Sequence, residues 1–443
     1  MIRLAEAELY RKVTDVTEFY KNAEIAVSEH DQISGSKQFG ESAMPPLSGI
    51  RVVEMGVMIA VPGAGETLAG FGAEVIKVED TIRGDELRNY GSSKDGMSGW
   101  FANANAGKRS IAVDLNSEQG KAVLWELLAK ADVFIQGFRS GVMEKLGFGY
   151  GTIAEKYPSL IYCSSTGFGE TGPYADLPAY DPIVQALSGW AGIQLTNNKP
   201  TLHKAMVSDK TAASYNTKAI LAALVQRGRT GKGCFIEASM LESNIMYNWP
   251  DVMMQCTLLD EDASHVPNIF ASYQLYQTRT GWVTVACGTD KQWQSFCAAL
   301  DGETYANDSR FITAVDRAAH IVEFFAVIGE LTAKFDGNIV VSRLRAADVP
   351  VAAVLMPEEV QHDDHIKSRD FIETRDHPVA GRYLSPKPPS AMFGEDLSLS
   401  PAPRLGEQTY EILTELGYSN EAIGDLLASG VVRKSKQITE GTN

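Results

Sequence analysis

Cysteine, histidine and long apolar runs are all scarce in this sequence. Its 443 residues include 5 cysteines and 7 histidines, and no CxxC or Cys/His spacing typical of a zinc site occurs. The cysteines are odd in number and unevenly spaced, which favours no disulfide framework and predicts a reduced, cytoplasmic setting. No apolar run reaches the roughly 18 residues of a membrane span, and the N-terminus is charged rather than signal-like. We therefore predict neither a metal site nor a membrane association.

Positive charge is also in deficit. Lysine and arginine total 40 against 56 aspartates and glutamates, a formal net charge of −16. Such an acidic chain is a poor ligand for nucleic acid phosphates, so no nucleic acid partner is predicted. A local basic pocket for a small anion remains compatible with it. With 44% hydrophobic residues, a chain of this length is expected to form two or three globular domains.

An N-terminal helical extension and linker are predicted over residues 1–46. Apolar residues recur at helical intervals up to residue 30, and the polar stretch that follows ends at Pro45-Pro46. This extension packs either on a partner subunit or on its own domain. Strands and helices alternate from Leu47 onward, which predicts an α/β domain of three layers with a mostly parallel sheet over 47–255. A hairpin followed by helices predicts a smaller α+β domain over 256–360. Residues 361–443 are expected to return to the large domain and end in helices.

Two phosphate-binding patterns fail on spacing. The loop after the first strand imitates G-x-G-x-x-G, but its third glycine position is Leu68, which argues against NAD or FAD. The run GRTGKG lacks the first glycine of a phosphate loop, because Gln226 occupies that position, and a strand rather than a helix follows it. A helix end and a turn are the better interpretation.

Two aspartates stand at predicted helix starts, Asp181 before Pro182 and Asp209 in VSDKTAAS. Unpaired backbone N–H groups and the positive end of the helix dipole favour a carboxylate at both places. Each aspartate is therefore either a helix cap or a functional carboxylate, and the pattern alone does not separate the two.

Several stretches, taken together and in this order, resemble the class III CoA-transferases of the formyl-CoA and carnitine types: LSGIRVVEM, FGAEVIKVE, GD-x-x-R, GKRSIAVDL, KADVFIQGF, GFGETGPY, AYDPIVQALSG and RTGKG. The resemblance implies a large Rossmann-like domain built from both ends of the chain, with a small domain inserted. It also implies a homodimer whose two subunits interlock. Acyl-CoA and small carboxylic acids are the implied substrates, with no metal and no redox cofactor.

The resemblance places the catalytic carboxylate at Asp209, with Asp181 in a supporting position. An ionised Asp209 would attack an acyl-CoA thioester and form first an anhydride and then an aspartyl-CoA thioester. Its place at a helix start is expected to favour ionisation at pH 7. The family's CoA contacts fall on Met58, Ile59, Val113, Asn116, Gly137, Phe138 and Lys145, and Lys108 and Arg109 are additional candidate phosphate contacts.

Departures from the family pattern leave the substrate open. Ile59 replaces a glutamine, Asp80 replaces an arginine, and no glycine run occurs between residues 255 and 290, so oxalate or formate specificity is not predicted. Candidates for a larger apolar acyl pocket are Trp190, Tyr215, Met246, Tyr247 and Trp249. An acyl-CoA racemase of the same fold is an alternative, although Tyr180 stands where racemases carry a histidine base. A CoA-binding homologue without catalysis is a second alternative.

Overall fold

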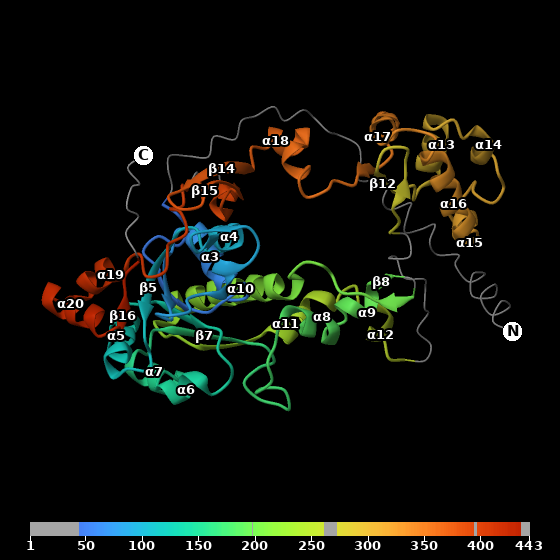
Figure 1. Ribbon diagram of the computed structural model, residues 1–443. Helices are drawn as coiled ribbons and strands as arrows, with labels where there is room; N and C mark the ends of the chain where they lie inside the picture. Colours follow the sequence, from blue (N-terminus) through green and yellow to red (C-terminus); the bar gives the residue numbers. More distant parts are fainter. Residues whose placement is uncertain (1–43, 197, 261–272, 394–396, 436–443) are drawn as a thin grey trace, which may run out of the picture. The chain divides into compact units, whose positions relative to one another are not determined.

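The computed structural model describes residues 44–196, 198–260, 273–393 and 397–435 (Figure 1). The predicted helical extension lies outside these residues except for its last three positions. Within them the chain forms two units, one made of residues 273–368 and the other of residues 44–260 together with 369–435. The larger unit is thus built from two separate parts of the chain. The sequence pattern predicts the domain boundaries at 256 and 361.

The larger unit is organised around a sheet whose strands run in the order β10-β7-β6-β1-β2-β5-β16. The strands are β1 (Arg51–Met55), β2 (Glu74–Glu79), β5 (Lys108–Val113), β6 (Val133–Gln136), β7 (Ile161–Thr166), β10 (Phe235–Ser239) and β16 (Val432–Arg433). All pairs are parallel except β16 with β5. The predicted Rossmann-like, mostly parallel sheet is confirmed, and β16 brings the C-terminal part of the chain onto its edge.

Strand order reverses beside β1, because β2 and β5 follow on one side of it and β6, β7 and β10 on the other. This is the doubly wound arrangement, in which ligands bind outside the carboxyl ends of the strands at the point of reversal. The loops that follow β1 and β6 lie at that point. The fold therefore directs attention to residues 56–61 and 137–141.

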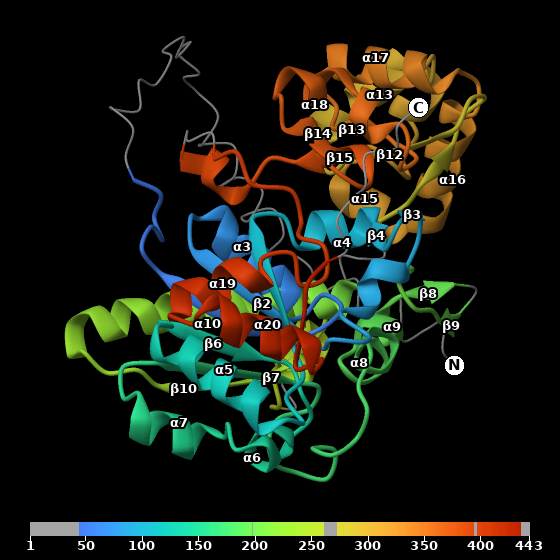
Figure 2. The same ribbon diagram turned by 60° about the vertical axis from the view of Figure 1, so that its left-hand side comes forward.

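Helices cover both faces of the sheet, which gives three layers (Figures 1 and 2). On one face Val52 lies in a core cluster with Leu68 of α3 (Pro62–Gly70) and Ile220 of α10 (Val207–Thr230). On the other face Val53 packs in a cluster with α5 (Glu118–Ala129), α19 (Thr409–Leu416) and α20 (Asn420–Ala428). Because both faces are covered, the inner strands β1, β2, β6 and β7 are buried along nearly their whole length rather than buried at every second residue.

Shorter elements complete the larger unit around this core. They are η3 (Glu86–Asn89), β3 (Ser93–Lys94), β4 (Met97–Ser98), α4 (Gly99–Ala104), α6 (Val142–Leu146), α7 (Tyr150–Lys156), α8 (Asp181–Leu187), α9 (Trp190–Ile193), β8 (Leu195–Thr196), β9 (Lys199–Pro200), α11 (Met240–Asn248), α12 (Met254–Thr257) and η6 (Pro389–Phe393). Helices α8 and α10 begin where the two aspartates predict helix starts, and Gly231 ends α10 in a left-handed conformation at φ 70°.

A hairpin that the sequence pattern does not predict occupies the returning segment. Strands β14 (Ile372–His377) and β15 (Gly381–Pro386) pair antiparallel in a stretch expected only to connect the two domains. Its turn is held by His377, whose Nδ1 accepts hydrogen bonds from the backbone N–H groups of Val379 and Ala380 at 3.0 and 3.1 Å. Val379 packs in a core cluster with Phe101 of α4.

The smaller unit combines an antiparallel sheet with helices, as predicted for an α+β fold. Its elements are β11 (Tyr276–Gln277), β12 (Trp282–Val285), α13 (Asp290–Ala299), α14 (Glu303–Ala306), α15 (Ala314–Ala319), α16 (Ile321–Thr332), α17 (Gly337–Ala346), β13 (Val351–Ala353), η5 (Val360–His362) and α18 (Asp364–Ser368). Its core centres on the fully buried Trp293, which stacks on Phe296 and meets Phe311 and Phe324 edge-on.

Candidate active site

The loop after β1 folds closely over the point where strand order reverses. Gly56 follows β1 and Gly137 follows β6, and a Cβ atom on either would lie 2.5 or 2.9 Å from a side-chain atom of Val61. The N–H of Gly137 also donates to the carbonyl of Met55 at 2.9 Å. A side chain at either position would require Val61 to move, so the close approach of the two loops favours glycine at both.

The start of α10 comes to the same edge of the sheet. The Asn216 side-chain amide donates to the carbonyl of Ala60 at 3.0 Å and to Oγ of Ser165, near the end of β7, at 2.8 Å. Asp209 lies in the first turn of α10, is 5% exposed, and accepts a backbone hydrogen bond from Ala60. The predicted catalytic carboxylate thus lies beside the loop of residues 56–61.

Asp181 binds the amino end of α10. Its Oδ2 accepts hydrogen bonds from the backbone N–H groups of Ser208 at 2.7 Å and Asp209 at 3.2 Å. Its Oδ1 accepts one from the Gln185 amide, whose own oxygen accepts from the N–H of His203. The N–H groups expected to stabilise Asp209 are therefore bound to Asp181 instead.

This arrangement makes Asp209 unusually basic. Burial and the neighbouring charge of Asp181 raise its pKa to about 7, against an opposing backbone hydrogen bond from Ala60. The expectation that the helix start keeps Asp209 ionised at pH 7 is therefore wrong. The N–H groups at that helix start bind Asp181, and the pKa of Asp209 is raised rather than lowered. Close to neutral pH both protonation states of Asp209 are populated.

The raised pKa predicts a pH-dependent stability. The folded Asp209 carboxyl holds its proton up to about pH 7, whereas in the unfolded chain it loses it near pH 4, so stability falls as pH rises between these values. At pH 8 the ionised group lowers the free energy of unfolding by roughly 4 kcal/mol at most. We expect Asp209→Ala to raise the thermal midpoint more at pH 8 than at pH 5. An equal effect at both values would contradict the assignment.

Four of the predicted CoA-binding residues gather at the point of strand reversal. Met58 and Ile59 lie in the loop after β1, where Ile59 is 6% exposed and packs among Leu87 and Phe101. Gly137 and Phe138 follow β6. Phe138 is 37% exposed, and its N–H donates to the side chain of Gln136 at 2.7 Å.

The other predicted CoA-binding residues lie elsewhere. Val113 is buried in the core at the end of β5, Asn116 is exposed just beyond it, and Lys145 is exposed on α6. Strand β5 is separated from β1 by β2, so Val113 and Asn116 lie two strands from the point of reversal.

The two candidate phosphate contacts already have protein partners. The Lys108 ammonium is fully buried and donates to Glu54 at 2.8 Å, the Pro62 carbonyl at 2.7 Å and Asn105 at 2.9 Å, which uses all three of its N–H donors. Arg109 lies near the amino end of β5 and pairs with Glu74 and Glu415. Neither Lys108 nor Arg109 is therefore left beside the loop after β1 with a donor that is not already bound to protein.

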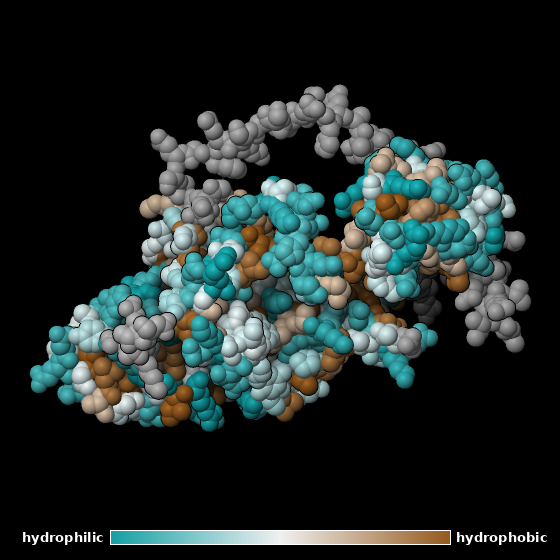
Figure 3. All heavy atoms as spheres, turned by 45° about the horizontal axis from the view of Figure 1, so that its top comes forward, coloured by the Kyte–Doolittle hydropathy of each residue, from teal (hydrophilic) through white to brown (hydrophobic). Residues whose placement is uncertain are grey.

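Two of the acyl-pocket candidates are joined to the start of α10. Trp190 stacks on Tyr247 with ring centroids 5.8 Å apart, and its Nε1 donates to Asn244 at 2.9 Å. Asn244 in turn donates to the carbonyl of Ser208 at 3.0 Å. Met246 and Trp249 are about half exposed, but apolar patches are common on the visible face, so exposure alone marks no site (Figure 3).

Three buried amides, Gln185, Asn216 and Asn244, escape prediction from the sequence although they tie the site together. The partners that link them to other elements, His203, Ala60, Ser165 and Ser208, are distant in the chain, so no local pattern identifies them. The only sequence signal is spacing: Gln185 lies four residues after Asp181 on one helix, on the same face.

The chain is similar to several known proteins. Residues 47–409 match CoA-transferase family III. A succinate–glutarate CoA-transferase of Agrobacterium fabrum is 33% identical over 84% of this chain and 96% of the relative, and a succinyl-CoA:glutarate CoA-transferase of Homo sapiens is 30% identical over 90% and 92%. A CaiB/BaiF family protein from Brucella suis has a solved structure with a TM-score of 0.75 and 31% identity, covering 84% of this chain and 100% of that one.

The chain therefore belongs to CoA-transferase family III, which confirms the resemblance seen in its motifs and the predicted class of enzyme. Within the described residues no group of three or more metal-ligating side chains comes together. Helices of the same residues are too short or too polar to cross a bilayer.

Proposed function

We propose that this protein moves CoA from an acyl-CoA donor to a carboxylic acid acceptor, with Asp209 as the nucleophile. One observation carries the proposal: a buried carboxylate with a pKa raised to about 7 lies beside the loop at the point of strand reversal. A basic carboxylate is a better nucleophile than one of ordinary pKa, and at neutral pH a large fraction of it is ionised.

The proposed transfer proceeds through two kinds of covalent intermediate. An Asp209 oxygen attacks the thioester carbon, the C–S bond breaks, and CoA leaves as the thiolate with an acyl–aspartyl anhydride formed. The thiolate then attacks the aspartyl carbonyl, which releases the donor acid and leaves an aspartyl-CoA thioester. The acceptor carboxylate attacks that thioester, and the freed thiolate finally takes the acceptor acyl group, which restores Asp209.

Asp181 is proposed as a positioning residue for this chemistry. Its carboxylate fixes the backbone of Ser208 and Asp209 through the two hydrogen bonds described above. Its charge also opposes ionisation of Asp209 and so maintains the basicity of the nucleophile.

For CoA itself we propose a site formed by Met58, Ile59, Gly137 and Phe138. Their position outside the carboxyl ends of β1 and β6 supports this choice. Phe138 is exposed enough to lie against the adenine ring. Val113, Asn116 and Lys145 stay predicted contacts of a more distant part of the ligand.

Short dicarboxylic acids are the proposed donors and acceptors. Two relatives support this choice. They are named as CoA-transferases of succinate or succinyl-CoA and glutarate, and this chain is 33% and 30% identical to them. A panel of acyl-CoA donors against mono- and dicarboxylic acids, followed by mass spectrometry of the CoA products, tests this choice. Exclusive use of monocarboxylic acids would contradict it.

A racemase of the same fold is the alternative. Tyr180 is 62% exposed at the position of the racemase histidine, and a phenol with a reference pKa near 10 is a poor base at neutral pH. We therefore expect no exchange of the α-proton when acyl-CoA is incubated in deuterated water without an acceptor. Rapid exchange would favour the racemase.

Trapping the intermediate tests the proposal directly. Incubation with acyl-CoA and hydroxylamine is expected to convert Asp209 to a hydroxamate, located by peptide mass spectrometry, because both anhydride and thioester react with this nucleophile. Hydroxamate on another carboxylate would show that a different residue is the nucleophile, and no hydroxamate at all would favour a CoA-binding protein without catalysis.

We also propose that the protein forms the interlocked homodimer, for which light scattering should give twice the 48.1 kDa of one chain.

A further inference from the structure

Met58 has a backbone conformation unusual for its side chain. Its φ of 63° lies in the left-handed region, which costs free energy for any residue with a Cβ atom. Every other non-glycine residue with positive φ in the described ranges is an aspartate or asparagine, the types that tolerate it best. Such strain persists where the surroundings hold it in place, and it gathers at ligand sites.

A carboxylate and an ammonium hold this loop in place. Oδ1 of Asp85 accepts the N–H of Met58 at 3.1 Å and that of Leu87 at 3.0 Å. Oδ2 of Asp85 lies 2.9 Å from the ammonium of Lys77, which also donates to the carbonyl of Gly56 at 2.8 Å. One ion pair thus fixes both ends of the peptide segment from Gly56 to Met58.

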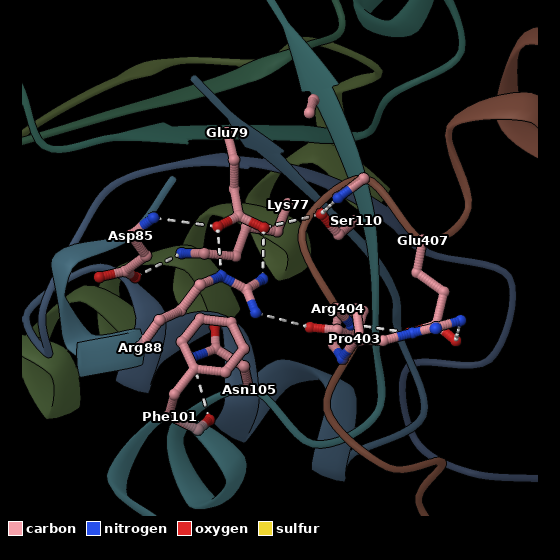
Figure 4. Close-up of polar contacts among 12 residues, drawn as sticks. Lys77, Glu79, Asp85, Arg88, Phe101, Asn105, Ser110, Pro403, Arg404 and Glu407 are labelled. Carbon is pink, nitrogen blue, oxygen red and sulfur yellow. Dashed lines mark hydrogen bonds and ion pairs between the residues drawn. The ribbon is translucent and has the colours of Figure 1, made fainter. Parts of the chain in front are cut away.

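The ion pair belongs to a buried network that resists rearrangement (Figure 4). Lys77 also pairs with Glu54 at 3.0 Å, and both side chains are fully buried. Glu79 accepts the N–H of Asp85 at 3.0 Å and pairs with Arg88 at 2.7 Å. Because buried charges are expensive when their partners are lost, each group keeps the others in place.

We infer that Asp85 is a positioning residue for CoA: paired with Lys77, it holds Met58 in the left-handed conformation that shapes the loop at the point of strand reversal. This inference rests on the proposed function, because it takes that loop as the CoA site. Asp85 itself is not proposed to touch the ligand. Its effect on CoA passes through the backbone of Met58.

Calorimetric titration of CoA into the purified full-length protein tests the inference. We expect Asp85→Asn to weaken CoA binding at least about tenfold, since the charge that pairs with Lys77 is lost. The matched control is Asp132→Asn. Asp132 pairs with Arg227 at 2.8 Å and accepts the N–H of Arg51 at 2.7 Å, so the same chemical change is made at the opposite end of β1.

The control should bind CoA within about twofold of the wild type. Equal CoA affinity of Asp85→Asn and the wild type would overturn the inference. A loss of CoA affinity in Asp132→Asn as large as that in Asp85→Asn would also overturn it, because general destabilisation would then explain both losses. Absence of CoA binding by the wild type would instead overturn the proposed function.

A second pair of variants needs no change to the buried network. Met58→Asn and Met58→Val both remove the methionine side chain, but asparagine tolerates the left-handed region and valine does not. We expect Met58→Asn to bind CoA at least about fivefold more tightly than Met58→Val, and Met58→Asn to recover part of the affinity lost in Asp85→Asn. Equal affinities of the two Met58 variants would overturn the inference even if Asp85→Asn does not fold.

Discussion

Replacing Asp209 with alanine is expected to lower kcat for CoA transfer by about 10³-fold or more. Without the carboxylate neither the anhydride nor the aspartyl thioester can form, and loss of a covalent nucleophile removes the whole covalent route. Product acyl-CoA measured by mass spectrometry under saturating substrates gives the rate. The nucleophile assignment fails if the variant keeps more than about a hundredth of the wild-type rate.

Two controls show that the loss is chemical. CoA affinity is expected to stay within a few-fold of the wild type, because the proposed CoA contacts lie in the loops after β1 and β6 rather than on Asp209. The protein should also fold, since removing a buried group of raised pKa relieves an unfavourable charge above pH 7. Asp209→Asn is a poorer choice, because slow deamidation restores the aspartate.

The layered fold is readable from the sequence because its strands are buried on both faces. Runs such as Arg51–Met55 and Val133–Gln136 stand out as short, largely apolar segments between helical ones. The hairpin of β14 and β15 is not readable in this way. Its strands read IETRDH and GRYLSP, mostly polar, and they are stabilised by pairing with each other and by contacts with α4 that no local pattern reveals.

Charges inside strands carry a signal that is easily missed. Glu54 and Lys77 interrupt two apolar strands, and a charge there predicts an internal partner because an unpaired one is too costly to bury. The identity of that partner depends on strand order, which aligns Glu54 with Lys77 in the parallel register of β1 and β2. Lys108 shows the same dependence on strand order. The sequence suggests a phosphate contact, but in the structure Lys108, on β5 two strands from β1, is buried and paired with Glu54.

The position of Asp209 is predictable from the sequence, whereas its basicity is not. Its helix start suggests stabilisation of the charge by backbone N–H groups. In the structure Asp181, from a different helix, takes the N–H groups of Ser208 and Asp209. A residue 28 positions away thus reverses the electrostatic effect expected from local context.

That reversal leads to a pH prediction for Asp181→Asn. In the wild type, kcat/KM should rise with pH and level off above about 7, as Asp209 ionises. Asparagine retains one oxygen for the N–H groups of Ser208 and Asp209 but removes the charge that opposes ionisation. The pKa of Asp209 then falls, so we expect the acidic limb to move down by about one pH unit, or about 1.4 kcal/mol in the protonation equilibrium.

Gln185→Ala separates this electrostatic effect from structural damage. Both substitutions disturb the contact between Gln185 and Asp181, but only Asp181→Asn changes the charge beside Asp209. A lower rate with the limb still near pH 7 is the expected result for Gln185→Ala. If the limb moves equally in both variants, or in neither, the charge of Asp181 does not set the basicity of the nucleophile, and burial alone must raise its pKa.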